Sequence, residues 1–289
     1  HTLSLHDALP IYQQALKASI KRIGAALGAP KSEITSQQIA HFEALSITNE
    51  WDSLAICTAL ILIHVWHFDE QIRLTAPITS SNHLISPVKP DFQNFLDTFD
   101  KVGHLPALSA CQKLSQENPG LNRDQIEHLK DILHNCRDIY NSLTLPIHQE
   151  AVLGSQTFHE LYNLKPQLNI ESYLLKYDKP IITGEQKASL NSWLDREDHH
   201  AGILTNRPNA TPSGYISAPE AEIGAKLIGL DGIPIIGSGV LNWFAETQAK
   251  LHAHTFLKPN PVHSLALMQI CLGQSLIDAL KMAVNLWQG

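Results

Sequence analysis

The sequence AGILTNRP occupies residues 201–208 and decides how the rest of the chain is interpreted. It is a short apolar run that ends in Thr205, which is typical of a parallel strand buried on both faces. Two more short apolar runs follow, at residues 233–236 and 255–257. Helical segments are predicted after each run, over 217–230, 240–251 and 260–272. This alternation predicts a parallel sheet with right-handed crossovers over residues 196–289.

The preceding part of the chain, residues 12–195, is predicted to be almost wholly helical. Apolar residues recur at helical spacing over 12–27 and 123–143, and residues 48–66 are apolar on most faces after Ser53. Further helices are expected over 36–45 and 184–194. Capping boxes mark the helix starts at Thr35, Asn122, Thr183 and Ser217, each with Gln or Glu three residues later. We therefore expect an α/β protein: an incomplete Rossmann-like parallel sheet core with a large α-helical cap domain.

Composition excludes several classes of function. The chain has 289 residues, of which 44% are apolar and 17% charged, and its net charge is -7. A negative chain without a basic run is a poor partner for nucleic acid. The longest apolar run, residues 55–66, is too short to cross a bilayer, so no membrane span is expected. The four cysteines are scattered without CxxC spacing, which predicts reduced thiols and a cytoplasmic location.

Two polar side chains are expected at the carboxyl ends of the strands, where open parallel sheets bind ligands. Thr205 ends the first strand and is followed by Asn206, and Lys258 follows the third strand. A hydroxyl and an ammonium group there are suited to binding one phosphate group. Each residue also has a plainer interpretation. A Thr at a strand end is a good β residue, and a Lys before Pro is commonly a solvated turn residue.

Two segments resemble motifs of the haloacid dehalogenase superfamily of hydrolases. GILTNRP, residues 202–208, resembles the second motif, and FLKPNPVHSL, residues 256–265, resembles the third. The long helical stretch before them resembles the cap of subfamily I members. The resemblance implies a Mg²⁺-dependent phosphatase that hydrolyses a small phosphate ester through a phosphoaspartyl intermediate. It assigns Thr205, Asn206 and Lys258 to phosphoryl binding, with Thr205 and Lys258 catalytic.

The superfamily's first motif, D-x-D-G after an apolar strand, does not occur in this sequence, and neither does the acidic fourth motif. We therefore expect a fragment without its nucleophile, inactive as given, whose Mg²⁺ ligands belong to a longer parent; the chain itself supplies no metal ligands. Residues 1–11 are expected to be a non-native string, residues 12–195 the cap, and residues 196–289 the partial core.

The expected cap offers one cluster for substrate selection. Asn49, Glu50, Trp51 and Asp52 open an otherwise apolar helix and could face a small phosphorylated metabolite. They fit equally well as an ordinary acidic first turn. Two other functions stay open: dehalogenase, phosphonatase or phosphomutase chemistry on the same fold, and a non-enzymatic helical binding module. The oligomeric state is not indicated by the sequence.

Overall fold

The computed structural model describes residues 6–7, 9–78, 84–100, 105–212, 214–253 and 255–288. Two compact units divide the chain. One is helical and spans Leu9–Lys176. The other extends from Tyr177 onward and includes the strand at His6–Asp7. The division thus falls between Lys176 and Tyr177, whereas the sequence suggested a boundary after residue 195. Residues 1–5 and 8 of the suspected N-terminal string lie outside the described residues.

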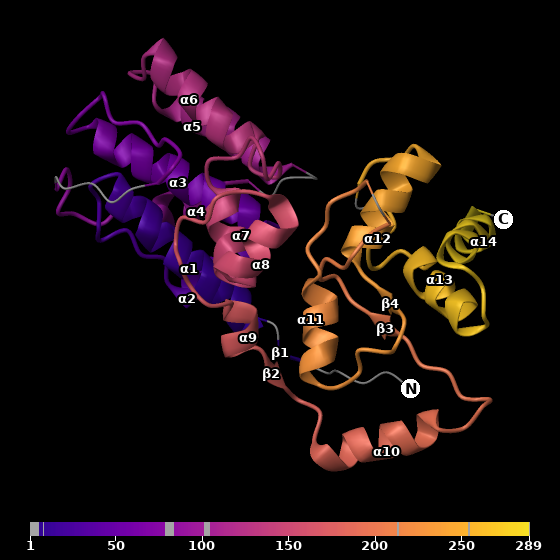
Figure 1. Cartoon of the computed structure of the whole chain (residues 1–289). Coiled ribbons are helices and arrows are strands. Elements are labelled where there is room, and N and C mark those ends of the chain that lie inside the picture. Colours follow the sequence, from indigo (N-terminus) through magenta and orange to yellow (C-terminus); the bar gives the residue numbers. More distant parts are fainter. Residues whose placement is uncertain are drawn as a thin grey trace. The chain divides into compact units, whose positions relative to one another are not determined.

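Among its described residues, the helical unit contains eight complete helices and all but the last residue of a ninth, α9 (Figure 1). They are α1 (Leu9–Ala26), α2 (Ser36–Ala44), α3 (Glu50–Trp66), α4 (Phe92–Thr98), α5 (Pro106–Glu117), α6 (Arg123–His134), α7 (Leu145–Leu153), α8 (Ser155–Tyr162) and α9 (Tyr173–Tyr177).

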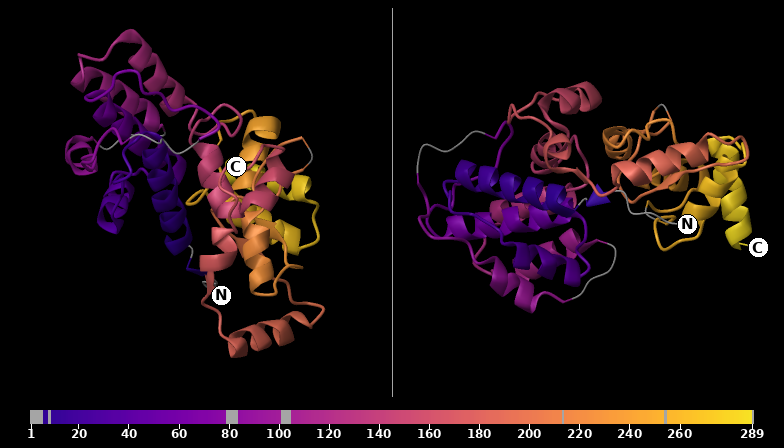
Figure 2. Two further views of the ribbon diagram at one scale, coloured as in Figure 1. Left: turned by 60° about the vertical axis from the view of Figure 1, so that its left-hand side comes forward. Right: turned by 90° about the horizontal axis from the view of Figure 1, so that it is seen from below.

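Helix α3 is the centre of this unit. It is apolar around most of its circumference, and its side chains from Asp52 to Thr58 are buried. Helices α1, α5, α6 and α7 pack against it, and Figure 2 shows α1 running beside it. A helix that is hydrophobic on all faces is stable only when neighbours cover it, as they do here. In the described part of the chain, no helix combines the length and apolar character needed to cross a membrane.

Several helix starts match the sequence prediction. Complete capping boxes form at Thr35 with Gln38, at Asn122 with Gln125, and at Thr183 with Gln186. The box predicted at Ser217 does not form, because the helix there begins at Glu220 after Pro219, without a side-chain cap.

The single helix predicted over residues 123–143 is wrong. Helix α6 ends at His134, and the chain turns before α7 begins at Leu145. The carboxylate of Asp138 accepts hydrogen bonds from the backbone N–H groups of Tyr140 and Asn141. Such an Asx turn competes with the helical hydrogen bonds, and the apolar periodicity did not reveal it.

The second unit combines short strands and helices (Figure 1). Its elements are β1 (His6–Asp7), β2 (Lys179–Pro180), α10 (Gly184–Leu194), β3 (Ile203–Leu204), α11 (Glu220–Leu227), β4 (Ile235–Ile236), α12 (Ser238–Trp243), a π-helical turn (Phe244–Ala249), α13 (Val262–Cys271) and α14 (Leu276–Gln288). Its core lies between the β3–β4 pair, α12, α13 and α14, around the fully buried Phe256.

The predicted Rossmann-like α/β core is not present, because the protein is mostly helical. In the described residues, the parallel sheet consists of β3 and β4 alone, two residues each. Flanking ladder bonds join Ile203 N to Pro234 O and Thr205 N to Ile236 O. Pro234 and Pro208 stand close to the strand ends, and a proline cannot donate to a ladder, which limits the extension of both strands.

The third predicted strand, over residues 255–257, is also wrong. Thr255 N–H donates to His252 O, and Asn260 N–H donates to Leu257 O. The side chain of Asn260 donates to Thr255 O as well. The backbone groups that a strand would use for pairing are thus engaged in local turns. Phe256 is buried, so the apolar residues that suggested a strand serve the core from a loop.

Candidate functional site at the end of β3

Thr205 lies directly after β3 and is partly buried. Its N–H donates to Ile236 O at 3.1 Å, which fixes its backbone beside the end of β4. Its Oγ1 accepts a hydrogen bond from Arg207 N at 3.0 Å. A hydroxyl has one hydrogen to donate, and this hydrogen is not used in the bond to Arg207. Thr205 is therefore suited to donate to an anion at this edge of the sheet.

Lys258 reaches the same place from a segment 54 residues away in sequence. Its Nζ donates to Leu204 O at 3.2 Å, and Leu204 is the residue before Thr205. An ammonium group has three N–H donors, so one is engaged with this carbonyl. The side chain is exposed, which leaves its charge accessible to a ligand from solvent. The ammonium group of Lys258 therefore lies at the end of β3, beside the residue that precedes Thr205. A joint role of Lys258 and Thr205 in binding one phosphate group stays a prediction.

Arg207 forms an ion pair with Asp178 beside this site. Arg207 Nη1 lies 2.7 Å from Asp178 Oδ2, and Nη2 lies 3.3 Å from Oδ1. The Asp178 side chain is 0% exposed and that of Arg207 is 10% exposed. The sequence does not reveal this pair, because nothing in the local pattern around Asp178 indicates a partner in the segment after β3.

The segment after β3 is also held through its backbone and through Asn209. Ser238 N–H donates to Arg207 O at 3.1 Å. Val240 N–H donates to the buried Asn209 Oδ1 at 3.0 Å. A Cβ atom at Gly237 would lie 2.6 Å from Arg207 O and 2.7 Å from Asn209 Oδ1. Glycine is thus required at position 237 for the start of α12 to approach this segment so closely.

His263 connects α13 to the same strand ends. It is buried, and its Nε2 lies 2.8 Å from Ile236 O, the carbonyl that also accepts from Thr205. Because a carbonyl only accepts, Nε2 carries the hydrogen, and the buried Nδ1 has no hydrogen-bond partner among the described residues. Burial lowers the pKa of His263, and the positive charge of Lys258 lowers it further. The lowered pKa favours the neutral form of His263, whose hydrogen bond to Ile236 O joins α13 to the end of β4.

The other predicted site residues have different surroundings. Asn206 is exposed at the turn between Thr205 and Arg207. Among the expected cap residues, Asn49 caps α3 by accepting from Trp51 N–H at 2.9 Å. Asp52 is buried, and its Oδ2 lies 2.6 Å from Arg137 Nη2. Its Oδ1 accepts from Cys136 Sγ at 3.4 Å. These contacts give Asn49 and Asp52 structural roles within the helical unit, and a substrate role for residues 49–52 stays a prediction.

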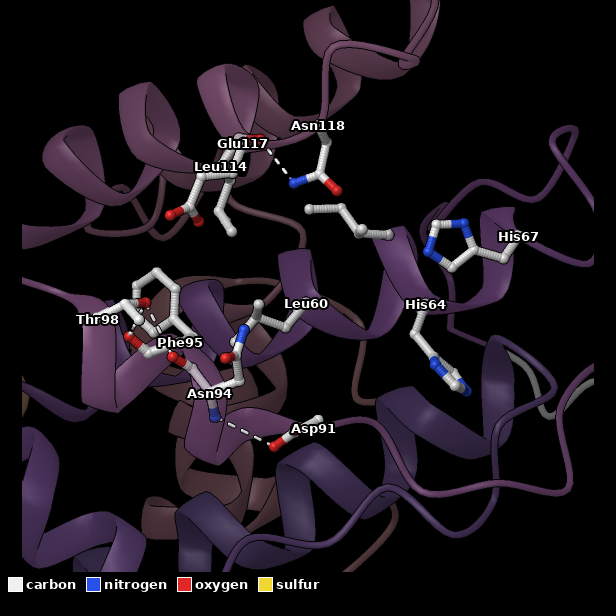
Figure 3. A pocket seen from close by; sticks show the side chains of 11 residues that line it. Leu60, His64, His67, Asp91, Asn94, Phe95, Thr98, Leu114, Glu117 and Asn118 are labelled. Carbon is white, nitrogen blue, oxygen red and sulfur yellow. Dashed lines mark hydrogen bonds between the residues drawn. The ribbon is translucent and has the colours of Figure 1, made fainter.

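The helical unit has a surface hollow of about 360 Å³ between α3, α4 and α5 (Figure 3). Polar side chains dominate its rim: His64, His67, Asp91, Asn94, Glu117 and Asn118. Several are already bonded locally. Asp91 caps α4, and the Asn118 side chain donates to Leu114 O. The hollow contains none of Thr205, Asn206 and Lys258, so it is separate from the residues that the sequence singled out.

The resemblance to the dehalogenase superfamily implies a Mg²⁺ ion. Across the described ranges, no group of three or more His, Cys, Asp or Glu side chains is placed to hold a metal ion. Arg207 and Lys258, the charged residues on either side of Thr205, are cations, and the Asp178 carboxylate beside them forms an ion pair with Arg207. One paired carboxylate among cations is not the oxygen-rich ligand set that a hard cation requires. These residues do not fit a Mg²⁺ site, and we derive no chemical step through the metal.

Comparisons with known proteins give a fold and no family. No protein family model matches the chain, and no curated protein matches it. An X-ray structure determined as a target of the Northeast Structural Genomics Consortium is similar, with a TM-score of 0.64 and 13% sequence identity. The similarity covers 97% of this chain and 78% of that chain. At this identity the likeness concerns the fold alone, and that protein carries no functional name.

Proposed function

We propose that the end of β3 is a phosphate-binding site, and that it serves a phosphatase of the haloacid dehalogenase type acting on a small phosphate ester. The observation that carries the proposal is the contact between Lys258 Nζ and Leu204 O at 3.2 Å. It brings the ammonium group of the segment resembling the third motif to the residue preceding Thr205 in the segment resembling the second. The proposal depends on these two segments and not on a Rossmann-like sheet.

The chemistry assigned to each residue is limited to binding and charge stabilisation. Thr205 supplies a hydroxyl donor, and Lys258 supplies a positive charge with N–H donors beyond the one used by Leu204 O. Both act on the oxygens of a phosphoryl group, where negative charge grows during transfer. The sequence holds no D-x-D-G motif, so no nucleophile is assigned to this chain. We also propose a cytoplasmic location, which the four unpaired cysteines support.

The test is a titration of the chain with inorganic phosphate, followed by ¹H–¹⁵N NMR. Saturable shifts are expected for the amides of residues 205–207 and 258. Lys258→Ala should weaken binding about 10- to 100-fold, the worth of one charge-assisted hydrogen bond. Thr205→Val removes the hydroxyl at constant shape and should also weaken binding.

The matched control is Lys226→Ala, which removes an exposed positive charge from α11. It should leave the phosphate affinity within about twofold of the wild type, as expected for a screened surface charge. Equal weakening by both lysine variants would show only non-specific charge attraction. The absence of saturable shifts in the wild-type chain would refute the phosphate site and leave the helical binding module as the better interpretation.

A further inference from the structure

Arg207 is held in place at three points. Its guanidinium forms the buried ion pair with Asp178, at 2.7 and 3.3 Å. Its N–H donates to Thr205 Oγ1 at 3.0 Å, and its carbonyl accepts from Ser238 N–H at 3.1 Å. The side chain and both backbone groups of one residue are therefore bonded, by Asp178 and Ser238 from two distant segments and by Thr205 from the same segment.

The bond from Arg207 N–H determines what the Thr205 hydroxyl can do. Because Oγ1 accepts this bond, the oxygen is held toward the Arg207 peptide, and the hydroxyl hydrogen points elsewhere. A rotation of the Arg207 peptide would remove the donor and release the Thr205 side chain to other rotamers. The rotamer of Thr205 thus depends on the position of the Arg207 N–H, and Arg207 is anchored by Asp178 at its side chain and by Ser238 at its carbonyl.

We propose that Arg207 and Asp178 are positioning residues, which fix the Thr205 hydroxyl in the orientation that binds a phosphoryl oxygen. The inference rests on the proposed function. The Arg207 charge is balanced by Asp178 at 2.7 Å, so the pair adds no net charge to the site. Its burial is also costly, since both ions leave water, and replacing such a pair with apolar residues is often neutral for stability. An apolar contact would stabilise this part of the fold as well as the ion pair does. A role in orienting Thr205 explains why Arg207 and Asp178 occupy these positions instead.

The experiment uses the charge-neutral double variant Asp178→Leu/Arg207→Met in the full chain. Two quantities are measured: the χ1 rotamer population of Thr205, from three-bond NMR couplings, and the affinity for inorganic phosphate. In the wild type, one χ1 rotamer is expected to dominate. In the double variant, we expect several rotamers to be populated and the phosphate affinity to fall about tenfold, as for the loss of one oriented donor.

A control separates positioning from stability. The double variant Glu127→Gln/Lys130→Gln removes an exposed ion pair on α6 and should change neither quantity. A single variant, Arg207→Lys, keeps the charge but not the forked geometry, so it should give an intermediate affinity. The amide shifts of α13 and α14 report whether each variant folds. If the double variant does not fold, Arg207→Lys serves as the test.

The outcomes distinguish this inference from the proposed function. If the wild type shows no saturable phosphate shifts, the proposed function fails, while the Thr205 couplings still report whether the ion pair orients the hydroxyl. If the wild type binds phosphate but the folded variants keep both the wild-type Thr205 rotamer and the wild-type affinity, the positioning role is refuted. A purely structural role would lower thermal stability and leave both quantities unchanged in the folded protein.

Discussion

Breaking the ion pair between Asp52 and Arg137 should destabilise the helical unit strongly. The Asp52 side chain is 2% exposed and that of Arg137 is 26% exposed, with Nη2 and Oδ2 at 2.6 Å. Arg137 Nε lies 3.3 Å from Oδ1, so two donors of the guanidinium face the carboxylate. Asp52→Asn keeps the shape of the side chain but removes its charge and places an amide donor toward the guanidinium.

The expected cost can be worked out from this geometry. Removing one partner of a buried ion pair costs about 3–5 kcal/mol, because the other ion stays buried while it loses its counter-charge. Arg137 is a quarter exposed, so water can hydrate part of its guanidinium once the carboxylate is lost. We therefore expect the lower end, about 3 kcal/mol, for the free energy of unfolding of the helical unit.

Native-state hydrogen exchange is the suitable assay, since it reports the two units separately. Amides of α3 in the Asp52→Asn variant should exchange with an opening free energy about 3 kcal/mol lower than in the wild type. Amides of α13 should be unaffected. The matched control is Glu33→Gln, which breaks an exposed pair with Lys21 at 3.9 Å. It should cost less than about 0.5 kcal/mol.

A result in which Asp52→Asn and Glu33→Gln destabilise α3 equally would refute the reasoning. It would mean that the buried carboxylate contributes no more than a surface charge. A ligand-binding role for Asp52, as first expected from the sequence, would then be the better explanation of its position.

Two further predictions concern acid sensitivity and the segment after β3. Burial lowers the pKa of His148 from 6.5 to about 4, so the unfolded state binds a proton first as the pH falls. The helical unit should keep its full stability above pH 6.5 and lose about 3 kcal/mol between pH 6.5 and 4; urea unfolding of His148→Leu should show a flatter pH profile, and an unchanged profile would contradict the assignment. Gly237→Ala places a methyl group 2.6 Å from Arg207 O and should cost about 1–3 kcal/mol and weaken phosphate binding. Gly232→Ala meets nothing within 4 Å and should be neutral in thermal unfolding, so equal effects of both variants would contradict the close approach at Gly237.

Local features of this protein follow from short stretches of sequence. Thr35, Asn122 and Thr183 each open a helix with a capping box, because the two reciprocal hydrogen bonds involve residues only three positions apart. The apolar residues 55–66 form a buried helix for a similar reason, since their composition leaves no polar face for solvent. The resemblance of two segments to motifs that act together led us to expect Lys258 near the end of β3, and its ammonium group does bond to Leu204 O. Whether Lys258 and Thr205 bind one ligand stays a prediction.

The extent of the sheet and the polar contacts across the fold were decided by tertiary structure alone. Residues 255–257 form a strand only if their backbone groups bond to another strand. Here the side chain of Asn260 donates to Thr255 O instead. Asp178 meets Arg207, and Asp52 meets Arg137, across 29 and 85 positions of the chain. Burying a carboxylate is costly unless it is paired with a cation and hydrogen-bonded. The sequence therefore supplies the carboxylates of Asp52 and Asp178. Which arginine pairs with each is decided by the packing of segments that are distant in the chain.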